Sequence, residues 1–322
     1  MSYNGYSKGG LTPLTEGAML AAITTILGVM AVYLPIIGIV AAFFWMIPIV
    51  VLCVRHGMRY ALLALTVVGV MLSLFVTPIM SLKMMASYGF LALALGFGFR
   101  RGWPAVKLFT ATVLGSLVGK ILLFGMLILM QVNPMEIQLE GFTEAFDSTF
   151  KLYEEMGMDE ASLEEARASI DESMKLVGLL TPCIFFLVAF LDGAVTYWAG
   201  GKVLGRLGVQ SPTFPPFKEW RLPAVCPYLL GFALIGMYWG SVHEIPRLYE
   251  ISLNINVLAM MAGIVQGMSL VFYAADRFQL SRMWRTFIII FILLNGFFAQ
   301  MLAFTGLLDM IFDYRRRFGG GR

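Results

Sequence analysis

The chain has 322 residues, of which 59% are hydrophobic and only 13% charged, and its mean hydropathy is +0.81. A soluble domain of this composition could not cover its surface with polar groups, and a formal net charge of +3 is too small to indicate nucleic-acid binding. A bilayer of about 30 Å is crossed by about 20 apolar helical residues, and lipid offers no partner for backbone polar groups. The composition therefore predicts helices that span a membrane.

Nine apolar segments predict an all-α, polytopic transmembrane helical bundle. The expected spans are 17–34, 36–54, 61–80, 84–99, 104–132, 176–199, 223–241, 252–274 and 286–312. The segment 84–99 is short, and Asn295–Gly296 interrupts 286–312, so we expect eight or nine crossings. Pro48 and Pro182 remove helical hydrogen bonds and predict kinks in their spans.

The distribution of Lys and Arg predicts a cytoplasmic N-terminus. One set of joints between spans carries thirteen of these residues: Lys8, Arg55, Arg59, Arg100, Arg101, Lys107, Lys202, Arg206, Lys218, Arg221, Arg277, Arg282 and Arg285. The short joints on the other side carry only Lys83 and Arg247, so the first set is expected to face the cytoplasm. Nine crossings would place the run Arg315–Arg317 outside, against this rule. We interpret that run as a plain stop anchor, or as a contact for anionic headgroups if it is cytoplasmic.

Three regions follow along the chain: membrane spans one to five over 1–132, an acidic extracytoplasmic insert over 133–175, and spans six to nine with a basic tail over 176–322. The insert carries twelve Asp and Glu residues against three Lys and Arg. It predicts two helices, the first ending at Gly157 and the second capped by Asp159. The insert is either a solvated helical cap over the bundle or a lid that attracts cations.

Two opposite charges lie deep in apolar segments. Lys120 is in the fifth expected span and Asp192 in the sixth, where an unpaired charge costs at least a few kcal/mol. The two spans run antiparallel, and the depths of the two residues differ by about 6 Å at 1.5 Å per residue. We therefore predict that Lys120 and Asp192 face the bundle interior, close enough to pair or to share a water-filled cavity. The alternatives are an ion pair that only fixes helix register and a Lys120 that extends outward toward the interface.

Buried amides and small residues mark further candidate positions. Gln266 and Asn295 become ligand contacts if they face the same cavity, and otherwise bond to neighbouring helices. Small residues four positions apart allow close approach of helix backbones. Such helix-docking pairs are Ala18 and Ala22, Gly115 and Gly119, and Gly263 and Gly267. Packing within the chain is the expected role of each pair, and docking of another protein is the alternative.

Enzymatic and metal chemistry is not indicated. The three cysteines, Cys53, Cys183 and Cys226, lie far apart in apolar runs, and His56 and His243 lie in separate polar joints. Phosphate-loop, dinucleotide-binding, HExxH and nucleophile-elbow motifs are absent. We expect no catalytic residues, no metal and no cofactor.

Three sequence stretches carry a family resemblance: Leu14-Thr-Glu-Gly-Ala-Met-Leu-Ala-Ala-Ile, Pro48-Ile-Val-Val-Leu-Cys-Val-Arg-His-Gly57-Met-Arg-Tyr, and Gly306-Leu-Leu-Asp309 with Asp313-Tyr-Arg. In these stretches the chain resembles the YybS-like family of uncharacterised bacterial membrane proteins. The similarity extends over most of the chain and implies a multi-pass membrane protein without a catalytic motif.

More distantly, residues 14–199 are similar to the substrate-binding S components of energy-coupling-factor transporters. This resemblance implies a cavity for a small solute that opens outward, and a membrane partner that docks on the first span at Ala18 and Ala22. The three additional C-terminal segments and the acidic insert depart from the S-component pattern.

Two functions from different classes follow. The first is a non-enzymatic protein of the cytoplasmic (inner) membrane that binds or transports a small solute near Lys120 and Asp192. Lys120 would bind an anionic group, and Asp192 would compensate the charge or couple to a cation. The second is a membrane scaffold or assembly factor for envelope or division machinery, in which the charged pair is structural.

Overall fold

The structure is a computed structural model that describes residues 13–131, 146–154, 156 and 158–319. Among these residues every regular element is a helix. Seven helices are long and apolar enough to cross a membrane, or up to eight if one bent pair counts as a single span. The prediction of an all-α polytopic bundle is confirmed. The expected helix stop at Gly157 lies outside the described residues.

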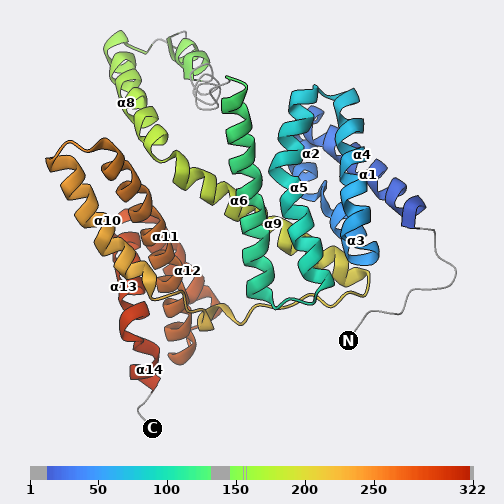
Figure 1. Cartoon of the computed structure of the whole chain (residues 1–322). Helices are drawn as coiled ribbons and strands as arrows, with labels where there is room; N and C mark the ends of the chain where they lie inside the picture. Colours follow the sequence, from blue (N-terminus) through green and yellow to red (C-terminus); the bar gives the residue numbers. More distant parts are fainter. Residues whose placement is uncertain (1–12, 132–145, 155, 157, 320–322) are drawn as a thin grey trace. The chain divides into compact units, whose positions relative to one another are not determined.

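The chain divides into two compact units, and the first comprises residues 1–144 and 185–213. Its helices are α1 (Pro13–Tyr33), α2 (Pro35–Phe44), α3 (Ile47–His56), α4 (Met58–Phe75), α5 (Pro78–Arg100), α6 (Ala105–Leu129) and most of α9 (Thr181–Arg206). Helix α5 packs against α3, α4 and α6 (Figure 1). Trp45, Leu52, Leu72 and Leu95 are fully buried where α1, α3, α4 and α5 meet. Burial of these large apolar side chains fixes the arrangement of α1 to α5.

The second expected span is broken in the structure. Helix α2 ends at Phe44 and α3 begins at Ile47, so this stretch forms two ten-residue helices instead of one continuous helix. Pro48 lies in the first turn of α3 and has no N–H to donate to Phe44, four residues earlier, which explains the interruption. Conversely, the fourth expected span, 84–99, is part of α5, which has 23 residues and is long enough to cross the membrane.

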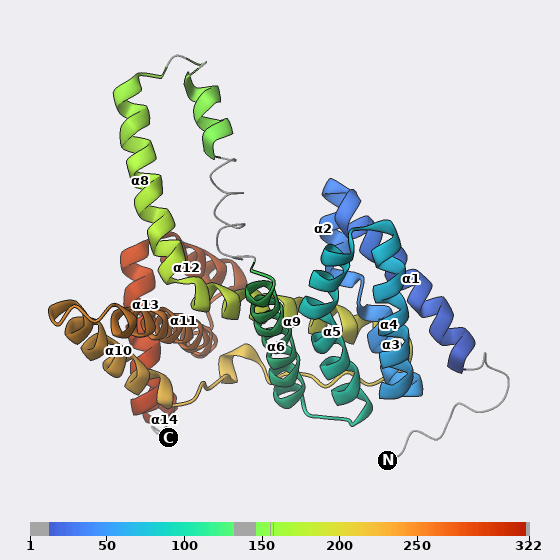
Figure 2. The same ribbon diagram turned by 45° about the horizontal axis from the view of Figure 1, so that its top comes forward.

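The second unit comprises residues 145–184 and 214–322. It contains a helix over residues 146–154, α8 (Glu160–Leu179), the short 3₁₀ helix η1 (Phe217–Glu219), α10 (Val225–Val242), α11 (Pro246–Arg277), α12 (Arg282–Leu294), α13 (Gly296–Phe312) and α14 (Tyr314–Gly319). Helix α11 packs against both α10 and α13 (Figure 2). Compactness thus groups the second half of the insert with the C-terminal helices, whereas the division at residues 132 and 175 stays a prediction.

Two expected local features of this unit are confirmed. The carboxylate of Asp159 accepts a hydrogen bond from the backbone N–H of Ser162 at 3.2 Å and caps α8. At Asn295 the chain bends by 105° between α12 and α13. The Asn295 side chain accepts from the N–H groups of Phe297 and Phe298, so it ends one helix and starts the next. The last apolar segment is therefore a bent pair of helices.

Candidate functional site

Lys120 on α6 and Asp192 on α9 form an ion pair inside the first unit. The Nζ of Lys120 lies 2.6 Å from the Oδ2 of Asp192 and donates a second hydrogen bond of 2.9 Å to the Oγ of Ser116. The two charged residues are only 7% and 8% exposed. The expectation that they face inward and meet is confirmed, and outward extension of Lys120 is excluded. Their role in ligand binding stays a prediction.

Small residues bring the helices close enough for this contact. A Cβ added at Gly119 would overlap the backbone oxygen of Ala86 on α5, and one at Gly115 would lie 2.9 Å from the backbone oxygen of Phe90. On the other side, a Cβ at Gly193 of α9 would lie 2.7 Å from Val113 of α6. The Gly115–Gly119 pair therefore packs within the chain and places Lys120 between α5 and α9.

Two neighbours of the pair were not predicted from the sequence. The Nζ of Lys120 lies 5.5 Å from the centre of the Tyr88 ring on α5, within the range of a cation–π contact. Ser116 precedes Lys120 by four residues, and this helical spacing could have identified it. Tyr88 carries no comparable signal, because its contact depends on how α5 packs against α6.

The geometry decides which chemistry this site supports. In a low-dielectric interior, an opposite charge at hydrogen-bonding distance removes most of the cost of each ion, whereas removal of one partner leaves the other uncompensated. The pair as a whole is neutral, with a hydroxyl and an aromatic ring beside the ammonium. It can bind an incoming solute only if the total charge at the site stays compensated.

The other predicted ligand residues have local partners in the second unit. Gln266 of α11 is 2% exposed, donates to Asp309 of α13 at 2.7 Å, and accepts from the N–H of Leu222 at 3.0 Å. Asn295 caps α13, as described above. These hydrogen bonds join helices and loops of their own unit, and a ligand-binding role for either amide is untested.

The remaining small-residue pairs differ from one another. Gly263 and Gly267 of α11 contact α13 so closely that a Cβ at Gly306 would overlap the backbone of both. That pair therefore packs within the chain. Ala18 and Ala22 are exposed on α1, so the described residues do not cover them. Docking of another protein at this pair is untested.

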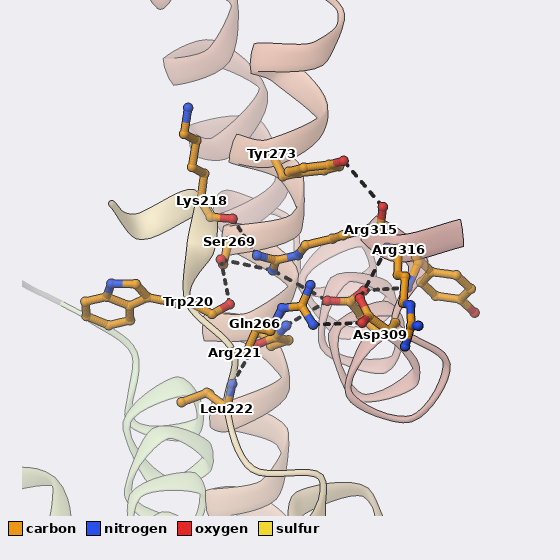
Figure 3. A network of polar contacts seen from close by, with 12 residues as sticks. Lys218, Trp220, Arg221, Leu222, Gln266, Ser269, Tyr273, Asp309, Arg315 and Arg316 are labelled. Carbon is orange, nitrogen blue, oxygen red and sulfur yellow. Dashed lines mark hydrogen bonds and ion pairs between the residues drawn. The ribbon is translucent and has the colours of Figure 1, made fainter. Parts of the chain in front are cut away.

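A second buried polar cluster surrounds Arg315 (Figure 3). Arg315 is 5% exposed, and its guanidinium lies 3.5 Å from the carboxylate of Asp309, which is 4% exposed. The same guanidinium donates to the Oγ of Ser269 at 3.0 Å and to the backbone oxygen of Lys218. Burial lowers the pKa of Arg315 from its ordinary value, against the opposing effect of Asp309. The side chain of Arg315 therefore turns into the protein, whereas Arg316 and Arg317 are exposed, and the interpretation of the run as a stop anchor stays a prediction.

The polar cluster also fixes the loop before α10. The hydroxyl of Ser269 donates to the backbone oxygen of Phe217 at 2.6 Å, and Gln266 accepts from Leu222 as noted. At the cluster's edge, Arg221 binds the carboxylate of Asp313 at 2.7 Å. Side chains of α11 and of the C-terminal segment thus hold residues 217–222 by backbone and side-chain bonds.

The helices, their apolar surfaces and the buried ion pair define a multi-pass α-helical membrane protein. The chain belongs to the family described as "Predicted membrane protein (DUF2232)", which matches residues 22–310. It is 23% identical over 314 residues to "Uncharacterized protein YybS" of Bacillus subtilis, covering 94% of this chain and 97% of that protein. The expected relation to YybS-like proteins is confirmed.

No solved structure matches the chain. The resemblance of residues 14–199 to S components stays a hypothesis.

Proposed function

We propose that this protein is a non-enzymatic protein of the cytoplasmic membrane that binds a small charged solute, with or without transport, at Lys120 and Asp192. One observation carries the proposal: two ionisable residues less than 9% exposed meet at 2.6 Å within helices apolar enough to span a membrane. Ionisable groups inside a membrane are costly, and in membrane proteins they mark solute or proton pathways.

Charge compensation restricts the class of solute. An anion bound to Lys120 alone would displace Asp192 and leave that carboxylate uncompensated in a low-dielectric site. A zwitterion avoids this cost, because its anionic group binds Lys120 while its cationic group binds Asp192. An anion that arrives with a proton for Asp192 satisfies the same condition. The solute is therefore a small zwitterion, or an anion whose binding is coupled to a cation.

A second function is favoured by a different property of the same pair. Lys120 already has Asp192, Ser116 and the Tyr88 ring as partners, which suits a permanent fastening of α6 to α9. In that case the protein is a membrane scaffold or assembly factor. The exposed Ala18 and Ala22 on α1 would then suit a partner helix, and the acidic insert a docking surface.

Equilibrium binding to the purified, reconstituted protein separates these functions. The probes are radiolabelled α-amino acids, as zwitterions, and radiolabelled monocarboxylates with and without a pH gradient. We expect one of these two classes of solute to bind the wild-type protein and to lose binding in Lys120→Met. Lys107→Met is the control, because it replaces an exposed lysine on the same helix, and it should bind the solute as the wild type does. Binding that survives in a folded Lys120→Met protein would contradict the proposed site.

A further inference from the structure

The start of α12 lies in a polar layer at the end of α11. Asp276, in the last turn of α11, binds the ammonium of Lys218 at 2.8 Å and the guanidinium of Arg285 at 3.2 Å. Lys218 belongs to the loop between α9 and α10, and Arg285 to the first turn of α12. The hydrogen bond and ion pair with Asp276 raise the pKa of Lys218, so its ammonium is charged at neutral pH. The start of α12 and the loop at residues 217–222 are therefore at the same end of the second unit.

The chain that leaves α13 reaches the same layer. Arg315 donates to the backbone oxygen of Lys218, and Arg221 in that loop binds Asp313 at 2.7 Å. Asp313 ends α13 in the left-handed conformation, with φ 45°, and this turn directs the following Arg315 into the polar cluster. The hydroxyl of Tyr273 near the end of α11 donates to the backbone oxygen of Arg315 at 3.4 Å. The two ends of the last apolar segment thus converge on one loop.

Helix length agrees with this convergence. Helix α12 has 13 residues and α13 has 17, so they are about 20 Å and 26 Å long at 1.5 Å per residue. Each is shorter than the roughly 20 residues that a crossing needs, and the chain turns by 105° between them. A segment that bends midway and ends where it began does not cross the bilayer.

From these contacts we propose that α12 and α13 form a re-entrant hairpin that enters and leaves the membrane at its cytoplasmic face. Arg315 acts as a latch that closes the hairpin onto residues 217–222. The loop contains Lys218 and Arg221, which belong to the Lys- and Arg-rich set of joints, so the positive-inside rule assigns it to the cytoplasm. The re-entrant path puts Arg316 and Arg317 on that side too, which removes the conflict with nine full crossings.

The latch differs from a surface ion pair in its burial. Arg315 and Asp309 are both at most 5% exposed, and their neighbours Gln266 and Ser269 are also buried. Removal of one member of such a group leaves its partners without hydrogen bonds. Loss of Arg315 should therefore release the loop as well as the C-terminal segment.

Single-cysteine labelling tests the re-entrant path in the full-length chain. With Cys53, Cys183 and Cys226 replaced by alanine, one cysteine is placed at Ala168 on α8, at Glu219 in the loop or at Arg317, all exposed positions. A membrane-impermeant maleimide is applied to right-side-out vesicles before and after detergent. We expect Ala168→Cys to react at once, and Glu219→Cys and Arg317→Cys to react only after detergent. Reaction of either of the last two before detergent overturns the proposal.

Hydrogen exchange tests the latch with a matched pair of variants. We expect Arg315→Met to increase exchange in residues 217–222, and Arg316→Met, which alters the exposed neighbour, to leave it unchanged. Fluorescence-detected size exclusion identifies variants that fail to fold. Unchanged exchange in a folded Arg315→Met protein overturns the latch. If Arg315→Met does not fold, Asp309→Asn replaces it with the same expected increase, and unchanged exchange there overturns the latch equally.

Discussion

The ion pair between Lys120 and Asp192 makes a quantitative prediction about stability. At 2.6 Å and an effective dielectric constant of about 20, two unit charges attract with about 6 kcal/mol. Desolvation of the two ions opposes this attraction by several kcal/mol. We therefore expect each neutral single substitution, Lys120→Met or Asp192→Asn, to lower the free energy of unfolding by about 3–5 kcal/mol, because each leaves a buried charge without its partner.

A double-mutant cycle measures the coupling directly. The double variant Lys120→Met/Asp192→Asn removes both charges, so its loss should be well below the sum of the two single losses. The difference should be at least about 2 kcal/mol, within the range for residues in direct contact. The assay is SDS titration in mixed micelles, with helicity followed by circular dichroism. Lys107→Met is the control, since its ammonium lies over the Trp103 ring at an exposed position and is worth about 0.5–1 kcal/mol.

Two results would refute this reasoning. Additive single losses, within about 0.5 kcal/mol, would mean that the two charges do not interact in the folded protein. Single losses no larger than that of Lys107→Met would mean that the site is hydrated well enough to tolerate a lone charge.

Three further predictions concern local packing, a buried amide and a helix cap. Gly119→Ala should destabilise the protein by about 1–3 kcal/mol, because the added methyl group would overlap the backbone of α5. In SDS titration its matched control is Gly125→Ala on the same helix, whose methyl group meets nothing within 4 Å and should stabilise the protein by up to about 1 kcal/mol. The Asn254 amide accepts from the N–H of Cys183 at 2.9 Å and donates to the carbonyl of Leu179 at 2.7 Å, so Asn254→Leu leaves these two backbone groups without that partner and should cost about 1–3 kcal/mol in the same titration. The control is Asn256→Leu, because among the described residues the Asn256 amide hydrogen-bonds only to the sulfur of Met237, at 3.4 Å. A loss in Asn254→Leu no larger than in the control would contradict the prediction. Hydrogen bonds from Ser162 lower the pKa of Asp159 in the folded protein, so the cap is fully formed above the ordinary pKa of 3.8 and is lost as pH falls through the lower folded pKa. Amide exchange in the first turn of α8 should increase as the cap is lost. Asp159→Asn is the control, because its cap has no carboxylate to titrate.

The sequence predicts most of the fold, because a membrane imposes simple lengths on its helices. The positions of α6, α10 and α11 follow from the length of their apolar runs. The breaks at Pro48 and Asn295 follow from a missing N–H and a capping side chain. Pro48 predicts an interruption in the second expected span, but the pattern of apolar residues does not show where one helix ends and the next begins, because apolar residues continue from Phe44 to Ile47.

The pairing of Lys120 with Asp192 was predictable from depth alone. Both residues are far from the ends of their segments, where water cannot compensate them, so each needs a partner and few other charges lie at that level. Ser116 was within reach of the sequence through its spacing of four residues from Lys120 on α6, but Tyr88 was not, because its contact depends on the rotation of α5 about its axis. Side chains that approach an ion in this way are determined by helix packing.

The same physical rule explains why the cluster around Arg315 is not predictable from the sequence. Near the end of a span a charged residue can reach water, so its sequence position does not require a partner. Whether Arg315, Arg316 or Arg317 turns inward depends on the left-handed residue Asp313 and on the short helix that follows it. A run of three arginines therefore has the same composition whether it anchors the chain at the surface or buries one member. Only replacement of the buried arginine should lower the free energy of unfolding. Comparison of Arg315→Met with Arg316→Met therefore shows which arginine is buried, which the sequence alone does not.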